Sequence, residues 1–134
     1  MNKMSNPNRI VVEGVQRMTP SEAFIETLVA QGVTDVFGIV GSAFMDALDI
    51  FPAAGIRFIP VAHEQGAVHA AEGYARSSGK VGCVLVTSGP GATNAVTGLT
   101  DAMLDSIPLV CITGQVPTHL IGSDAFQECD TVGI

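Results

Sequence analysis

The sequence is poor in charge and in aromatic rings. Of its 134 residues, 14% are charged and 5% are aromatic, with no tryptophan, whereas 47% are apolar. Such a composition can bury a core and excludes an intrinsically disordered chain. Basic residues are also scarce, because Lys and Arg number 6 against 13 Asp and Glu, which gives a net charge of -7. Nucleic acid and anionic membranes both need a basic surface, so neither is expected as a partner.

Long apolar runs and paired cysteines are missing too. No stretch approaches the roughly 20 apolar residues of a membrane span, and residues 10–12 are too short for the core of a secretory signal. The cysteines are odd in number and lack CxxC spacing, so we expect buried thiols in a reducing compartment: Cys83, Cys111 and Cys129. These features predict a cytoplasmic protein. Residues 1–17 have no clear periodicity and are expected to form a leader or flexible tail.

The remaining residues alternate between short apolar segments and helical patterns. Thr19, Pro20 and Glu22 form a capping-box start for a helix that Gly32 ends. Further helices are expected at 42–51, capped by Ser42, and at 64–78 and 90–105, with strands at 36–39, 56–61, 81–86 and 109–113. The alternation predicts an α/β fold, a doubly wound parallel sheet with helices on both faces. The weak pattern of 114–134 suggests that a domain spanning 18–134 is incomplete at its C-terminal end.

Glycine and polar residues gather where the predicted strands end. Four turns, at 38–42, 63–66, 87–94 and 113–115, would converge on one rim of the sheet, where open parallel sheets bind ligands. Glu64 lies in the second turn and opens a helix. Its carboxylate could simply complement the helix dipole. On an apolar rim it could instead serve in proton transfer.

Familiar metal and phosphate motifs do not match these turns. An HExxH motif starting at His63 would need a histidine where Ala67 stands, and His69 falls on a different helix face from His63. The turn at 89–94 completes neither GxGxxG nor a P-loop. No metal site is expected from these side chains. The 89–91 turn is a close-approach loop that could face a flat ring or an anion.

Two motifs carry a family resemblance. They are HEQGA at 63–67, continuing as AEGYAR at 71–76, and SGPGATN at 88–94. In this order they resemble the N-terminal, pyrimidine-binding domain of thiamine-diphosphate-dependent enzymes, over residues 18–134. Within that family, the part from 81 onward, above all GSDAFQECD at 122–130, resembles the acetolactate synthase catalytic subunit. The segments at 18–24, 38–51 and 55–61 are more similar to sulfoacetaldehyde acetyltransferase.

The resemblance implies roles for the residues of the rim. Glu64 would be the catalytic residue: it would bind ring nitrogen N1′ of the cofactor's aminopyrimidine and favour the imino form that deprotonates the thiazolium carbon. Pro90 and Asn94 would contact the pyrimidine. Gly41 would offer its backbone to the thiazolium side or to the substrate.

The resemblance also implies a reaction. The implied enzyme is a transferase or lyase that joins 2-oxo acids, most simply acetolactate synthesis from pyruvate in branched-chain amino acid biosynthesis. Phe126 and Gln127 would line the substrate channel, with ordinary packing under a loop as the alternative for Phe126. Formation of acetyl phosphate from sulfoacetaldehyde and phosphate is the second possibility, and a non-catalytic binding fragment is the third.

Half of the implied site is missing from this sequence. In the family, a separate domain holds the cofactor's diphosphate and Mg²⁺ through a Gly-Asp-Gly motif, and no such motif occurs here. The family's two half-sites come from different subunits, so a homodimer or homotetramer is implied for the full-length protein. The resemblance leaves FAD and a regulatory subunit open as further partners. The 134-residue chain alone is expected to be inactive.

Overall fold

The structure, a computed structural model, describes residues 17–134, so the leader or flexible tail expected at the N-terminus lies outside the described residues except for Arg17. Four strands form one parallel sheet in the order β2-β1-β3-β4. The strands are β1 (Asp35–Gly38), β2 (Arg57–Pro60), β3 (Gly82–Val86) and β4 (Leu109–Thr113). Pro60 ends an edge strand, where its missing N–H interrupts no further ladder.

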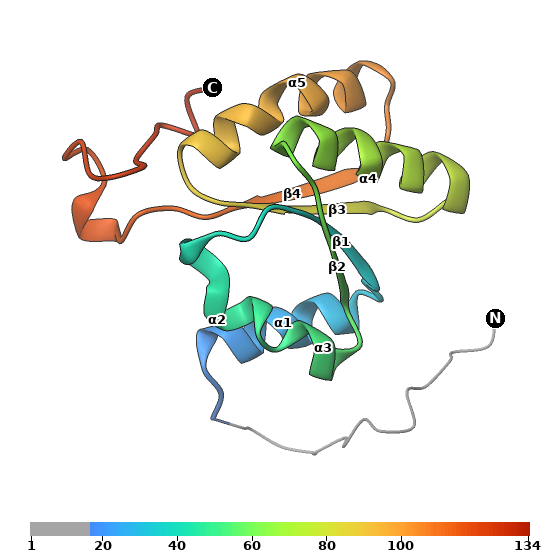
Figure 1. Ribbon diagram of the computed structural model, residues 1–134, viewed down its shortest axis with the longest axis horizontal. Helices are drawn as coiled ribbons and strands as arrows, with labels where there is room; N and C mark the ends of the chain where they lie inside the picture. Colours follow the sequence, from blue (N-terminus) through green and yellow to red (C-terminus); the bar gives the residue numbers. More distant parts are fainter. Residues whose placement is uncertain (1–16) are drawn as a thin grey trace.

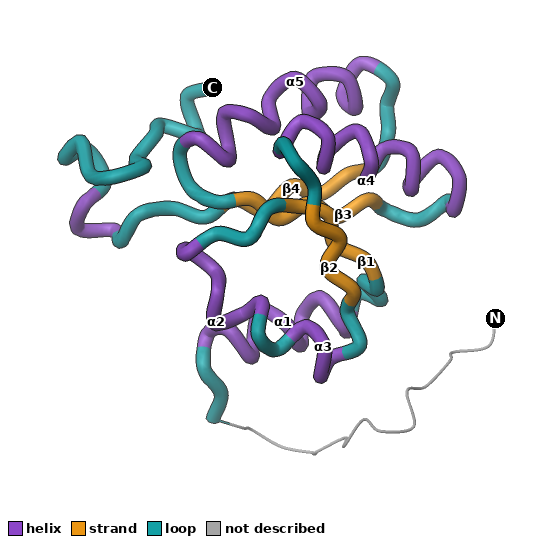
Figure 2. The backbone as a smooth tube through the Cα atoms, viewed as in Figure 1, coloured by secondary structure: helices purple, strands orange, loops and turns teal. Residues whose placement is uncertain are grey.

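Helices cover both faces of this sheet (Figure 1). On one face lie α1 (Pro20–Ala30) and the two short helices α2 (Met45–Leu48) and α3 (Phe51–Ala54). On the other face, α4 (Glu64–Ser78) and α5 (Pro90–Leu104) lie side by side (Figure 2). The predicted α/β fold with a parallel sheet between two helical layers is therefore confirmed.

The central strand β3 joins two hydrophobic cores. Its side chains alternate, so that Cys83 and Leu85 pack with α1, α2 and α3, whereas Val84 and Val86 pack against α4 and α5. All residues of β3 are buried, as its continuous apolar run predicts. Complete burial of a Val or Leu side chain contributes about 1.5–3 kcal/mol to the stability of the fold. The buried side chains of β3 therefore stabilise the packing of both helical layers against the sheet.

The first helix starts as its sequence predicts. The backbone N–H of Glu22 donates to Thr19 Oγ1 at 3.2 Å, and the backbone N–H of Thr19 donates to Glu22 Oε2 at 2.7 Å. The Thr19 backbone bond is the main cause that lowers the pKa of the Glu22 carboxyl. Gly32 follows the helix with a φ of 76°, a conformation that suits glycine.

The single helix predicted for 42–51 is wrong. Ser42 to Phe44 form a turn of 3-10 helix, α2 covers only Met45–Leu48, and α3 begins separately at Phe51. The break precedes Pro52, which has no N–H to donate to the carbonyl of Leu48 and so cannot continue the ladder of α2 into α3. The cap predicted at Ser42 is also wrong, because Gly41 precedes the turn and no side chain caps it.

The two long helices begin where predicted and pack closely. A Cβ added at Gly98 of α5 would lie 2.5 Å from the Cβ of Val68 on α4, so this glycine permits the close approach. Beyond β4, the chain from 114 to 134 has turns and one 3-10 segment, Thr118–Leu120, as its weak pattern predicts.

The three cysteines are free thiols. Cys83 is buried and the other two are half-buried. Burial raises the pKa of Cys83 and of Cys111 to about 11, so both thiols stay protonated near neutral pH. No helix within residues 17–134 combines the length and the apolar character that a membrane span requires.

Candidate functional site

The rim of the sheet is formed where the strand order reverses. Strands β1 and β3 are neighbours, and from them the chain proceeds outward to β2 on one side and to β4 on the other. Ligands of open α/β sheets bind at such a switch point. The turns after β1 and β3 are in contact there, because a Cβ added at Gly41 would lie 2.6 Å from the Cβ of Thr87.

The turn after β4 joins the same rim. A Cβ added at Gly114 would lie 2.5 Å from the Cβ of Ala43 and 3.1 Å from the backbone nitrogen of Ser88. Three of the four turns singled out in the sequence therefore touch one another. Gly41 and Gly114 leave room for these contacts because they have no side chain.

Glu64 connects the remaining turn, at 63–66, to the turn at 87–94. His63 caps α4, with its Nδ1 accepting a 3.2 Å hydrogen bond from the backbone N–H of Gln65. Glu64 is thereby placed at the first position of α4, where it is 8% exposed. Asn94 of α5 donates from Nδ2 to Glu64 Oε2 at 3.0 Å. The structure thus brings together two of the predicted site residues, and their contact fixes one carboxylate oxygen.

Pro90 lies one turn before Asn94, at the exposed start of α5. Gly89 precedes it with a φ of 43°, and a Cβ there would lie 2.3 Å from the carbonyl oxygen of Gln127. Only glycine accommodates both the positive φ and this contact. The predicted substrate-channel segment therefore passes directly over the N-terminus of α5.

A single carboxylate organises that segment. Glu128 accepts hydrogen bonds from the backbone N–H groups of Gly122, of Ser123 at 3.2 Å and of Ala125 at 3.2 Å. These bonds, that of Gly122 foremost, lower the pKa of Glu128. Gln127 has a φ of 61°, uncommon for a residue other than glycine.

Phe126 stands at the tip of the same loop and is 87% exposed. Ordinary packing beneath a loop, the alternative considered for it, is not seen among residues 17–134. Its ring is presented outward at the rim. Sequence reasoning missed Glu128, although an acidic residue shortly after a Gly-Ser-Asp turn is a signal for a carboxylate that accepts backbone N–H groups.

One oxygen of the Glu64 carboxylate is available at the rim. Within the described part of the chain, Glu64 Oε1 has no hydrogen-bond partner, and it is not among the fully buried unpaired oxygens. A nearly buried carboxylate with one fixed and one available oxygen can accept a hydrogen bond from a ring nitrogen. Residues 17–134 place no cluster of metal-ligand side chains at this rim.

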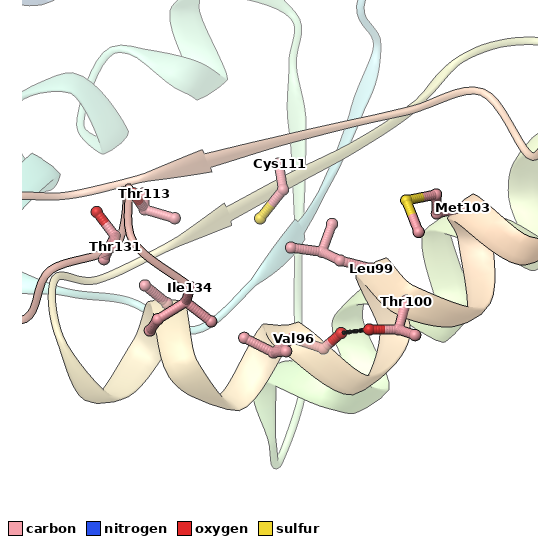
Figure 3. Close-up of a pocket in the computed structure, with 9 residues that line it drawn as sticks. Val96, Leu99, Thr100, Met103, Cys111, Thr113, Thr131 and Ile134 are labelled. Carbon is pink, nitrogen blue, oxygen red and sulfur yellow. Dashed lines mark hydrogen bonds between the residues drawn. The ribbon is translucent and has the colours of Figure 1, made fainter.

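A separate groove lies between α5, β4 and the last residues of the chain (Figure 3). Its volume is about 450 Å³, and its walls include Leu99, Met103, Cys111 and Ile134. Neither Glu64 nor Asn94 lines it. Because its walls are mainly apolar and the fixed carboxylate lies elsewhere, we do not assign the cofactor to this groove.

Comparisons with known proteins agree with this geometry. The family described as "Thiamine pyrophosphate enzyme, N-terminal TPP binding domain" matches residues 18–134. Sulfoacetaldehyde acetyltransferase of Castellaniella defragrans is 57% identical over 93% of this chain and 21% of the relative. Acetolactate synthase large subunit is 57% identical in Haemophilus influenzae, over 90% of this chain and 21% of the relative. The Lactococcus lactis protein of that name is 59% identical, over 85% of this chain and 20% of the relative.

The chain spans about a fifth of the length of these curated relatives. The family match covers every described helix and strand, including both turns that carry the HEQGA and SGPGATN motifs. Thiamine pyrophosphate is thiamine diphosphate under its older name. The chain therefore belongs to the thiamine pyrophosphate enzymes and corresponds to their N-terminal cofactor-binding domain.

Proposed function

We propose that this chain supplies the cofactor-activating half of the active site of a thiamine-diphosphate-dependent enzyme, and that the enzyme makes acetolactate from pyruvate. The observation that carries the proposal is the burial and hydrogen bonding of the Glu64 side chain. Its side chain is nearly buried at the switch point, Asn94 holds Oε2 at 3.0 Å, and Oε1 is available to a ligand. A fixed carboxylate in a partly desolvated site is suited to proton transfer.

Thiamine diphosphate, when bound, supplies a nucleophilic carbon and an electron sink for decarboxylation and carbon–carbon bond formation. The protein's part is to orient the pyrimidine and to hold a proton on its ring nitrogen. With the cofactor bound, Glu64 Oε1 would accept a hydrogen bond from that ring nitrogen. Asn94 prevents the carboxylate from rotating away, which keeps the acceptor in place through the reaction.

Neighbouring residues of the rim position the ring. Pro90 presents an apolar ring at the exposed start of α5, one turn from Asn94, and offers a surface on which an aromatic ring can rest. Gly41 brings its backbone to the rim because Thr87 leaves no room for a side chain. The two residues contribute surface and hydrogen-bonding groups rather than proton transfer.

The choice of acetolactate rests on the loop at 122–128. Its sequence resembles the acetolactate synthases, and Gln127 runs against the Gly89 turn that precedes Pro90. Phe126, 87% exposed at the loop tip, is available to contact a substrate. The segment that most resembles the acetolactate synthases is thus the one that lies over the proposed pyrimidine site.

Acetyl phosphate formation from sulfoacetaldehyde and phosphate is the second candidate. The segments at 18–24, 38–51 and 55–61 resemble the enzyme of that activity. Two relatives of that name, from Castellaniella defragrans and Alcaligenes xylosoxydans xylosoxydans, match 93% and 92% of this chain at 57% and 58% identity. The cofactor chemistry is the same, and only the acceptor differs.

The rest of the enzyme lies outside this chain in the proposal. Residues 18–134 form an incomplete pyrimidine domain, and a second domain holds Mg²⁺ and the diphosphate. The full-length protein is proposed to act in the cytoplasm as a homodimer or homotetramer. FAD and a regulatory subunit are compatible additions, the latter because several relatives are named as large subunits.

The test is an assay of the full-length enzyme with pyruvate alone, and then with sulfoacetaldehyde and phosphate. Acetolactate formation in the first assay supports the proposal. Acetyl phosphate in the second, with no acetolactate in the first, replaces it by the second candidate. The 134-residue chain assayed alone is expected to show neither product, because half of the site is absent.

A further inference from the structure

A second group of polar side chains lies farther along α4. Helices α4 and α5 lie alongside each other (Figure 1). His69 and Glu72 are one turn apart on α4, and Asp101 of α5 lies close to both. The ligand atoms of these three residues all lie within 4.8 Å of one another. Glu72 is eight residues beyond Glu64, about 12 Å along a helix axis, so the group is not part of the rim.

Glu72 is the unusual member of this group. Its side chain is only 6% exposed. Oε2 accepts from His69 Nδ1 at 2.8 Å, whereas Oε1 is the one fully buried side-chain polar atom within residues 17–134 that has no partner. A buried carboxylate is normally compensated by a positive charge or by several hydrogen bonds. Here the compensation is incomplete.

The charge of the group is equally unbalanced. Two carboxylates meet one imidazole, and the nearby Arg76 is committed to Asp105 instead. With a neutral imidazole, the three side chains carry two negative charges in a small volume. A divalent cation bound by Glu72 Oε2 would neutralise both charges, including that of the buried carboxylate whose Oε1 has no partner.

We propose that His69, Glu72 and Asp101 bind a Zn²⁺ ion. Zinc accepts one imidazole nitrogen and two carboxylate oxygens at about 2.0–2.2 Å, in tetrahedral geometry with water as the fourth ligand. Tetrahedral ligands at that radius are separated by roughly 3.3 Å. The observed separations from His69 Nδ1, 2.8 Å to Glu72 Oε2 and 3.6 Å to Asp101 Oδ2, lie on either side of this value. All three ligand atoms lie within 4.8 Å of one another, so side-chain rotations would bring the Glu72 and Asp101 oxygens to the same spacing.

Gln65 supplies the supporting contact that such a histidine needs. Its side-chain amide lies 3.4 Å from His69 Nε2. When Nδ1 binds metal, Nε2 carries the proton and requires an acceptor, which the amide oxygen provides after a flip of the amide. The mixed nitrogen and oxygen ligands favour zinc over Mg²⁺, which prefers six oxygens.

The test is calorimetric titration of the full-length protein, saturated with Mg²⁺ and thiamine diphosphate, with ZnCl₂. A Cys129→Ser background removes the half-buried thiol outside the two cores. We expect one ion per chain. His69→Ala and Asp101→Asn should each weaken the association constant at least tenfold. His119→Ala, which removes an exposed histidine elsewhere, should change it less than twofold. Co²⁺ should give a tetrahedral visible spectrum without a sulfur charge-transfer band.

Thermal melting gives a second readout that does not depend on catalysis. Zinc should raise the melting temperature of the parent protein and leave that of His69→Ala unchanged. The proposal is overturned if the folded parent binds no zinc, or if His69→Ala and Asp101→Asn bind it as tightly as the parent. In either case the group is an ordinary histidine–carboxylate pair.

Discussion

Asn94 Nδ2 lies 3.0 Å from Glu64 Oε2, although the two residues are 30 positions apart in the chain. Glu64 opens α4 and Asn94 lies in the second turn of α5. The contact exists because the two helices follow different strands and pack side by side on one face of the sheet. The orientation of the proposed catalytic carboxylate is therefore a product of tertiary packing, and it can be tested through either residue.

Replacing Asn94 tests the value of this contact. Asn94→Ala removes the donor and should destabilise the fold by about 1.5–3 kcal/mol, as expected for a hydrogen bond to a charged group. Asn94→Asp preserves the shape of the side chain but places two carboxylates at hydrogen-bonding distance. It should therefore lower the free energy of unfolding at least as much as Asn94→Ala at neutral pH. Urea unfolding measures both. Free energies of unfolding within about 0.5 kcal/mol of the parent would show that the contact contributes little.

Glu64→Gln tests the proposed catalytic role. The amide keeps the size of the side chain and can still bond Asn94, but it is a far weaker acceptor for a proton. In the full-length enzyme, kcat should fall by about 10²- to 10⁴-fold, the usual contribution of a positioned acid or base. Glu26→Gln, on the exposed side of α1, is the matched control and should retain activity. Survival of most activity in Glu64→Gln would remove this residue from the mechanism.

The sheet and the long helices are predictable from local signals. Pro20 and Pro90 each stand at the first turn of a helix, and β3 is recognisable as a strand buried on both faces. The single helix predicted for 42–51 is wrong because apolar spacing alone does not register Pro52, whose missing N–H separates α3 from α2. A local backbone rule would have corrected this error.

The site is predictable only in outline. The sequence indicates that Glu64 lies at the rim, because it opens a helix that directly follows a strand. It does not indicate that Asn94 fixes Oε2, or that the backbone of Gln127 covers Gly89, since both contacts join segments far apart in the chain. Sequence spacing relates His69 only to His63, which falls on a different helix face. In the fold, the neighbours of His69 are Glu72, one turn away, and Asp101 on another helix.

A glycine comparison tests the packing of the rim. Gly41→Ala would place its Cβ 2.6 Å from the Cβ of Thr87, so the turn after β1 must shift. We expect a loss of about 1–3 kcal/mol in the free energy of unfolding, together with weaker binding of cofactor in the full-length enzyme. Gly73→Ala is the control, because nothing lies within 4 Å of its added Cβ. Because Gly73 lies within α4, its replacement by Ala should raise the free energy of unfolding by about 0.5–1 kcal/mol. Equal effects of the two variants would contradict the close contact.

The loop over the proposed pyrimidine site should open in acid. Backbone N–H groups, that of Gly122 foremost, lower the pKa of Glu128 below its ordinary value of 4.5. A carboxyl with a lowered pKa in the folded state stabilises that state fully above the ordinary value, and the stabilisation is lost as the pH falls through the lowered pKa. Amide exchange of Gly122, Ser123 and Ala125 should therefore be slow at about pH 6 and lose its protection, relative to the intrinsic rate, as the pH falls below 4.5. Glu128→Gln should show weak protection at both pH values, whereas Asp124→Asn should behave like the parent. Protection that is independent of pH in the parent, or unchanged in Glu128→Gln, would mean that another contact holds the loop against Gly89.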